Sequence, residues 1–113
     1  MQRGDIYFLQ SNISNGSVQT GRRPVIVVQN NYGNQYSTTT IVCSITSAKK
    51  KWLPTHLYVG KVGGLYKHSI ILCEQIFTVD KAELTDYVGT ITNQKILNKL
   101  NKCLALSLNI TKE

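Results

Sequence analysis

Long apolar runs are absent from this chain of 113 residues, and proline is scarce. No stretch approaches the roughly 20 consecutive apolar residues that a membrane-spanning helix needs. The opening residues, MQRGDIYFLQ, reach Asp5 too early for a secretory signal peptide. These absences predict a cytoplasmic protein with no segment in a membrane. Because apolar residues make up 42% of the chain, we expect a single folded domain spanning residues 1–113.

Carboxylates are also few, and all six are scattered along the chain: Asp5, Glu74, Asp80, Glu83, Asp86 and Glu113. A two-metal nuclease needs several carboxylates that converge on ions about 4 Å apart, so this distribution argues against one. The chain also lacks the G-x-S-x-G, P-loop and H-E-x-x-H patterns of familiar catalytic sites. We therefore expect neither a metal site nor a cofactor.

The cysteines Cys43, Cys73 and Cys103 form no C-x-x-C pair and have no histidine at metal-ligand spacing. The spacing therefore predicts three buried thiols in a reducing compartment.

Basic residues are plentiful, with 13 Lys plus Arg against 6 Asp plus Glu and a net charge of +7. Such an excess suits a polyanionic partner without identifying one. The positive charges are spread along the chain, among them Arg22 and Arg23, the triplet 49–51, and Lys95, Lys99 and Lys102. The triplet can equally be a solvated loop, and the last three lysines a solvated helix face.

Short strands separated by Gly, Asn and Ser clusters are expected over the first eighty residues, a pattern typical of a sandwich or small barrel. The predicted strands are Asp5 to Gln10, Pro24 to Asn30, Thr39 to Thr46, His56 to Val59 and Ser69 to Thr78. Val25 to Val28 is apolar without alternation, which indicates a strand covered on both faces.

A different pattern follows Val79. Residues Asp80 to Leu84 are expected to form a single turn. The apolar spacing from Thr92 to Leu108 predicts an amphipathic helix with Thr92 as its N-cap.

Polar side chains remain at or near the ends of the predicted strands: Arg22, Arg23, Ser44, Thr46, His56, Glu74 and Gln75. A guanidinium group stays charged at any working pH, and its forked donors match phosphate oxygens. Arg23, fixed between Pro24 and a buried strand, is therefore suited to a phosphoryl transition state. It can equally be a rim residue that pairs with an acid, and the residues alone leave both interpretations open.

Five segments, taken in order, together resemble the MazF/PemK toxins. They are R-G-D-I-Y, G-S-V-Q-T-G-R-R-P-V-I-V-V-Q-N, T-T-T-I-V-C-S-I-T, L-P-T-H and S-I-I-L-C-E-Q-I. The resemblance implies a mainly β fold with a C-terminal α-helix, an SH3-like or CcdB-like small barrel, working as a homodimer in the bacterial cytoplasm. It also implies the toxin of a type II toxin–antitoxin system, a sequence-specific, metal-independent endoribonuclease acting on single-stranded RNA. Its regulator would be a MazE-like antitoxin whose acidic tail binds the positive groove.

The same resemblance assigns two catalytic residues. The arginine of the family's G-x-R-P signature falls on Arg23, and its essential threonine, at the end of the third strand, falls on Thr46. In the implied reaction the RNA's own 2′-hydroxyl attacks the adjacent phosphorus, leaving a 2′,3′-cyclic phosphate and a 5′-hydroxyl. Arg23 would stabilise the phosphoryl charge and is a candidate proton donor, while Thr46 would hold a non-bridging oxygen.

The implied RNA contacts are more widely spread. By position in the family, Asn30, Leu53 and Gln75 are candidate base contacts, and Ser17 and Gln19 belong to a loop over the scissile phosphate. Beside the lysine triplet, Trp52 could stack on a base or only pack over the barrel mouth.

Val18 departs from the family pattern, because many members carry an acid between the Ser and Gln of G-S-x-Q. If that carboxylate acts as a base, another group must replace it. His56 is one candidate, because histidine titrates near physiological pH, and Glu74 is another. Each has an alternative: His56 can cap the P-T-H turn, and Glu74 can be buried against Arg23 or Arg3.

Two rival functions stay open at this point. A CcdB-like gyrase poison shares the implied fold but does not need the arginine and threonine. A catalytically inactive barrel that only binds RNA is the other, and Val18 is the best argument for it.

Overall fold

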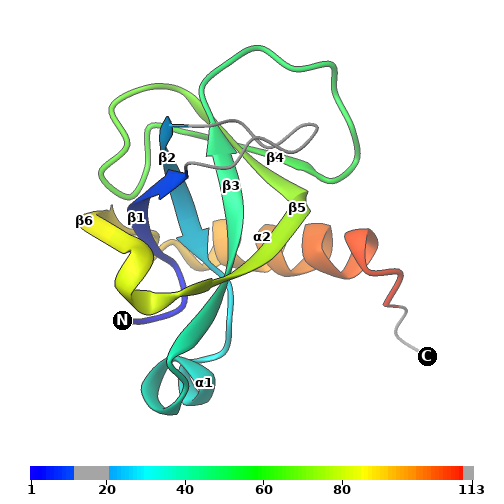
Figure 1. The fold of residues 1–113 in the computed structure, drawn as a ribbon. Coiled ribbons are helices and arrows are strands. Elements are labelled where there is room, and N and C mark those ends of the chain that lie inside the picture. The colour runs from blue at the N-terminus through cyan, green and yellow to red at the C-terminus, as the bar shows by residue number, and fades with distance from the viewer. Residues whose placement is uncertain (12–20, 111–113) are drawn as a thin grey trace.

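The computed structural model describes residues 1–11 and 21–110. Its elements in chain order are β1 Asp5–Ser11, β2 Gly21–Val27, α1 Asn31–Tyr36, β3 Thr39–Thr46, β4 His56–Gly60, β5 Ser69–Asp80, the 3₁₀ turn η1 Lys81–Glu83, β6 Leu84–Thr90 and α2 Gln94–Ser107 (Figure 1). The mainly β fold with a C-terminal helix is confirmed.

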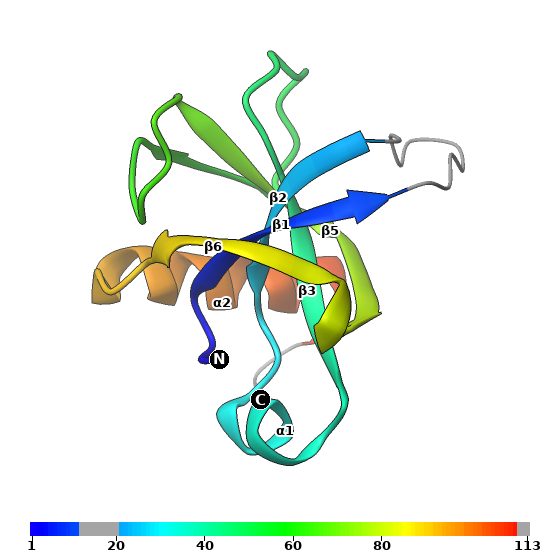
Figure 2. The same cartoon turned by 60° about the vertical axis from the view of Figure 1, so that its left-hand side comes forward.

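The six strands form one curved antiparallel sheet in the order β4-β5-β3-β2-β1-β6. Within the described ranges the edge strands β4 and β6 do not pair with each other, so the sheet is not closed into a barrel by hydrogen bonds. Helix α2 lies across one face of the sheet, and α1 projects from one end of it (Figures 1 and 2).

Strand β2 has a packed layer on each of its faces. Ile26 is fully buried and belongs to the apolar cluster that includes Cys43 and, from α2, Leu100. Val25 and Val27 belong to a second cluster on the opposite face. The two-sided burial predicted for Val25 to Val28 is confirmed for its first three residues, and Val28 is half-buried.

The apolar spacing of α2 places Leu100 in the core, with Ile96, Leu97, Cys103 and Leu104 packed around it. The predicted helix is therefore confirmed. The prediction of Thr92 as its N-cap is wrong by one residue. Oδ1 of Asn93 accepts hydrogen bonds from the backbone N–H groups of Lys95 at 2.9 Å and Ile96 at 3.2 Å. Both residue types make good N-caps, and the structure uses Asn93.

Helix α1 and strand β6 were not predicted, although the turn before β6 was. Helix α1 is short, contains Gly33 and carries no apolar stripe, so it lacks the usual helix pattern. It begins where Oδ1 of Asn30 accepts a hydrogen bond from the Gly33 N–H at 2.8 Å, which is why the predicted strand Pro24 to Asn30 ends early, at Val27. Strand β6 contains no buried residue, pairs with β1 through shifted registers and has a positive φ of 35° at Asp86, which obscures its alternation.

In the described part of the chain, no helix combines the length and apolar character needed to cross a membrane.

The three cysteines converge on one cluster from β3, β5 and α2. Burial is confirmed for Cys43 and Cys73, while Cys103 is half-buried and its Sγ donates to the Pro54 carbonyl at 3.8 Å. A hydrogen bond with the Cys43 thiol, together with burial, raises the pKa of Cys73; burial next to Cys73 raises the pKa of Cys103. Thiols held protonated in this way are poor nucleophiles.

We expect the free energy of unfolding to fall as the pH rises above the ordinary cysteine value of 9.0. Above that pH, unfolded Cys73 releases its proton while folded Cys73 keeps it, so raising the pH favours the unfolded state. Urea unfolding at about pH 7 and about pH 10 should therefore show a larger loss of stability in the wild type than in Cys73→Ala. Equal losses would contradict this.

Candidate active site

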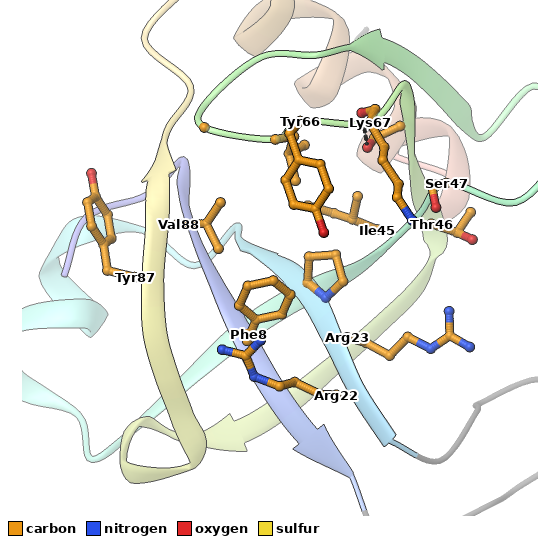
Figure 3. Close-up of a pocket in the computed structure, with 14 residues that line it drawn as sticks. Phe8, Arg22, Arg23, Ile45, Thr46, Ser47, Tyr66, Lys67, Tyr87 and Val88 are labelled. Carbon is orange, nitrogen blue, oxygen red and sulfur yellow. Dashed lines mark hydrogen bonds between the residues drawn. The ribbon is translucent and has the colours of Figure 1, made fainter.

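A cleft of about 400 Å³ opens at the end of the sheet where β2 begins and β3 ends (Figure 3). The loops from β3 to β4 and from β4 to β5 rise at this end, whereas α1 lies at the opposite end (Figure 2). The lining residues are Phe8, Arg22, Arg23, Pro24, Ile45, Thr46, Ser47, Gly64, Leu65, Tyr66, Lys67, Ser69, Tyr87 and Val88.

Arg23 and Thr46 both line this cleft because of how β2 pairs with β3. Val27 is paired with Val42, and Val25 with Ser44. The pairing ends at Val25 and Ser44, and Arg23 and Thr46 each lie two residues further along their strands, so their side chains point to the same face of the sheet as that pair. Since opposite residues of an antiparallel pair point to the same face, the two predicted catalytic side chains share one side of the cleft (Figure 3).

Arg22 lines the cleft from the other face of β2, because successive side chains of a strand alternate. Its guanidinium carbon lies 3.7 Å from the centroid of the Phe8 ring, and its Nη2 pairs with the Asp86 carboxylate. Among the described residues no carboxylate lies within salt-bridge distance of Arg23. The rim residue paired with an acid is therefore Arg22, which favours the phosphate-binding interpretation for Arg23.

The Thr46 hydroxyl is held in place by its own turn. Its Oγ1 accepts a hydrogen bond from the Ala48 backbone N–H at 3.1 Å, and the residue is only 7% exposed. With its oxygen engaged as an acceptor, the hydroxyl retains its proton for donation. A donor fixed in this way is suited to a phosphoryl oxygen.

Lys67 and Tyr66 are cleft residues that the sequence analysis did not single out. They come from the loop between β4 and β5, and the Lys67 side chain extends toward Thr46 (Figure 3). With Arg22 and Arg23, Lys67 gives the cleft three positive side chains, and none of the lining residues described is a carboxylate. The one available signal in the sequence is the Gly63–Gly64 pair, which marks a tight turn in this loop.

The remaining predicted contacts are dispersed. Trp52 and Leu53 are 63% and 44% exposed in the loop from β3 to β4 and line no part of the cleft. Asn30 caps α1, which lies at the end of the sheet opposite the cleft. Within one chain, Asn30 therefore does not lie near Arg23. Gln75 is half-buried where β5 shifts its register against β3. Ser17, Val18 and Gln19 lie outside the described residues.

His56 and Glu74 interact with each other outside the cleft. Nε2 of buried His56 lies 3.1 Å from Oε2 of Glu74, and Thr55 donates to the second carboxylate oxygen at 3.0 Å. The alternative in which Glu74 is buried against Arg23 or Arg3 is wrong, because Glu74 is exposed and Arg3 donates instead to the Val28 carbonyl and Asn101.

A family model for PemK-like, MazF-like toxins of type II toxin–antitoxin systems matches residues 2–108. This chain belongs to that family. The toxin is 43% identical over 110 residues to Endoribonuclease EndoA of Bacillus subtilis, an alignment that covers 96% of this chain and 94% of that protein. It is 39% identical over 112 residues to Endoribonuclease MazF of Staphylococcus saprophyticus, covering 97% and 92%.

Solved structures share the fold of this toxin. A mycobacterial endoribonuclease in complex with its cognate antitoxin has a TM-score of 0.81 at 26% identity, covering 100% of this chain and 99% of that one. MazF from Deinococcus radiodurans has a TM-score of 0.79 at 19% identity, covering 97% of each chain. The CcdB/MazF-like fold is thereby confirmed, with the sheet left open.

The wall of the cleft formed by the loop from β4 to β5 depends on Gly64. A Cβ added there would lie 2.2 Å from the Val88 carbonyl oxygen, and φ is +86°. We expect Gly64→Ala to displace this loop from β6, lower the thermal midpoint and lower any activity that depends on Lys67.

Gly60→Ala is the matched control for Gly64→Ala. Gly60 also has a positive φ, of +66°, but a Cβ there would meet only His68 Nδ1, at 3.9 Å. In Gly60→Ala, backbone strain should therefore lower the free energy of unfolding by about 1–2 kcal/mol, without a steric clash of the added Cβ. Equal thermal shifts for the two variants would show that the contact with β6 does not position the loop.

Proposed function

We propose that this toxin is an endoribonuclease that cleaves single-stranded RNA at a specific sequence without a metal ion. The observation that carries the proposal is that Arg23 and Thr46 line one cleft, together with further cations and hydroxyl groups. Both curated relatives are named endoribonucleases, and each matches this chain over nearly its whole length. The gyrase-poison alternative gives no role to this pair.

The reaction uses the substrate's own nucleophile. The 2′-oxygen of the RNA bonds to the adjacent phosphorus and releases its proton to water, while the bond from phosphorus to the 5′-oxygen breaks and that oxygen gains a proton. The products are a 2′,3′-cyclic phosphate and a 5′-hydroxyl. The protein has to stabilise the charge that accumulates on the phosphoryl oxygens, which preorganised donors do most effectively.

Arg23 and Thr46 take the two principal parts in this step. The Arg23 guanidinium donates to the phosphoryl oxygens and is the candidate proton donor to the leaving 5′-oxygen. The Thr46 hydroxyl donates to a non-bridging oxygen, and Lys67 adds a further positive charge. We assign no base role to His56 or Glu74, because they pair with each other outside the cleft.

The proposed assembly is a homodimer in the bacterial cytoplasm, inhibited by a cognate MazE-like antitoxin with an acidic tail. One related structure is an endoribonuclease in complex with its cognate antitoxin. The net charge of +7 and the cationic cleft suit an acidic inhibitor.

The direct test is to incubate the purified toxin with a long single-stranded RNA in excess EDTA and to map both ends of every product. We expect discrete cuts that share a short motif and leave 5′-hydroxyl and 2′,3′-cyclic phosphate ends. Intact RNA from a protein shown to be folded would overturn the proposal, and so would cuts that require a divalent ion.

Arg23→Ala and Thr46→Ala should each lower kcat/KM for RNA cleavage at least about a hundredfold, the usual cost of one transition-state donor. Arg23→Lys should remain impaired, because an ammonium group cannot reproduce the forked contact. Lys95→Ala and Thr92→Ala remove exposed side chains of the same classes near α2 and serve as controls. Near-normal cleavage by a folded Arg23→Ala or Thr46→Ala would remove that residue from the mechanism.

A further inference from the structure

A second hollow, of about 350 Å³, adjoins the catalytic cleft. Ser47 and Ser69 line both, so the two hollows are adjacent. The second hollow is further lined by Lys49 and Lys50 from the loop after β3, Tyr58 from β4 and His68 from the segment before β5. The aromatic residue that shares this space with the lysines is therefore Tyr58, not Trp52.

The strand register connects this hollow to the catalytic threonine. Ile70 is paired with Thr46 of β3 on one side and with Tyr58 of β4 on the other. The three residues form a row across adjacent strands, and paired residues point to the same face of the sheet. Strands lie about 4.8 Å apart, which puts Tyr58 about 10 Å from Thr46 along the row. Ile70, only 6% exposed, is the floor between them.

The chemistry of the second hollow suits a nucleotide. Tyr58 is 55% exposed, so one of its ring faces is accessible to a base. Lys49 and Lys50 supply positive charge beside it, and His68 supplies ring nitrogens that can donate or accept. No carboxylate is found among the lining residues described. An aromatic face next to a cationic path is the usual arrangement for single-stranded nucleic acid.

We propose that this hollow is a subsite for a nucleotide flanking the scissile phosphate, with Tyr58 stacked on its base and Lys49 and Lys50 bound to its phosphate. The inference rests on the proposed RNA cleavage. Because every base has a stacking face, this subsite raises affinity without selecting the base. The recognition motif and the affinity of the toxin for RNA are then set by different residues.

The test uses an RNA that carries the mapped motif and a 2′-deoxy sugar at the attacking position, so that it binds without being cut. Tyr58→Ala should weaken its binding roughly 5- to 150-fold, the range for loss of one stacked base. Tyr58→Phe keeps the ring and should bind like the wild type. Tyr36→Ala removes a tyrosine of similar exposure, 67%, from α1 at the opposite end of the sheet and is the matched control.

Two further measurements identify the contacts. Each nucleotide that flanks the scissile phosphate is replaced in turn by an abasic nucleotide. At one position the replacement should weaken RNA binding by the wild type but not by Tyr58→Ala. That position identifies the nucleotide whose base stacks on Tyr58. The Lys49→Ala/Lys50→Ala double variant should make the salt dependence of log K shallower by about 1.4, as expected for two lost phosphate contacts. Lys95→Ala/Lys99→Ala removes two exposed lysines from α2 and should change this slope less.

The outcomes separate this inference from the proposed function. If the wild type cuts no RNA, the proposed function fails. If the wild type cuts RNA but Tyr58→Ala binds it as tightly as Tyr36→Ala does, the subsite assignment is overturned. It is also overturned if Tyr58→Ala and the double lysine variant weaken binding of an oligoglutamate peptide and not of the RNA, because the hollow would then belong to an acidic protein partner.

Discussion

The pairing of β2 with β3 is the constraint on which the site depends. Residues 25–27 of β2 are buried on both faces of the sheet, so a slip of one residue would exchange the side chains of the two core clusters. That exchange is costly, and the register is correspondingly well determined. Arg23 lies two residues beyond the buried part of β2, and Thr46 two residues beyond its partner Ser44. Their juxtaposition follows from the packing of the core.

Because side chains alternate along β2, the two neighbouring arginines point to opposite faces of the strand and make different contacts. Arg22 stacks on Phe8 and pairs with Asp86, which ties the start of β2 to β1 and β6. Arg23 lines the cleft together with Thr46, whose hydroxyl is held by the Ala48 N–H. A buried strand thus presents one arginine that contacts neighbouring strands and one for which we propose phosphate binding. This is the physical reason for two arginines beside a proline at the entrance of a strand.

The other walls come from loops that the sheet holds close together. Gly64 and Gly89 let the segment between β4 and β5 approach the backbone of β6, and this segment carries Tyr66 and Lys67 into the cleft. The loop after β3 brings Lys49 and Lys50 beside Tyr58. Cleft and hollow therefore lie side by side and share Ser47 and Ser69, so an extended RNA strand that crosses both meets charge, hydroxyl groups and an aromatic ring in turn.

The sequence by itself determined the elements whose patterns are local: the five strands, the apolar face of α2, the two-sided burial of 25–27, and the motifs that carry the family with Arg23 and Thr46. It missed α1 and β6, because α1 depends on the Asn30 cap and on hydrogen bonds of buried Asn34 with Gln29 and Thr40, and β6 depends on pairing with β1. Only the tertiary structure decided which arginine faces Thr46, that Lys67 enters the cleft, and that Tyr58 lies in a row with Thr46. Those relations depend on strand register and loop docking between distant segments, and no local pattern of residues encodes them.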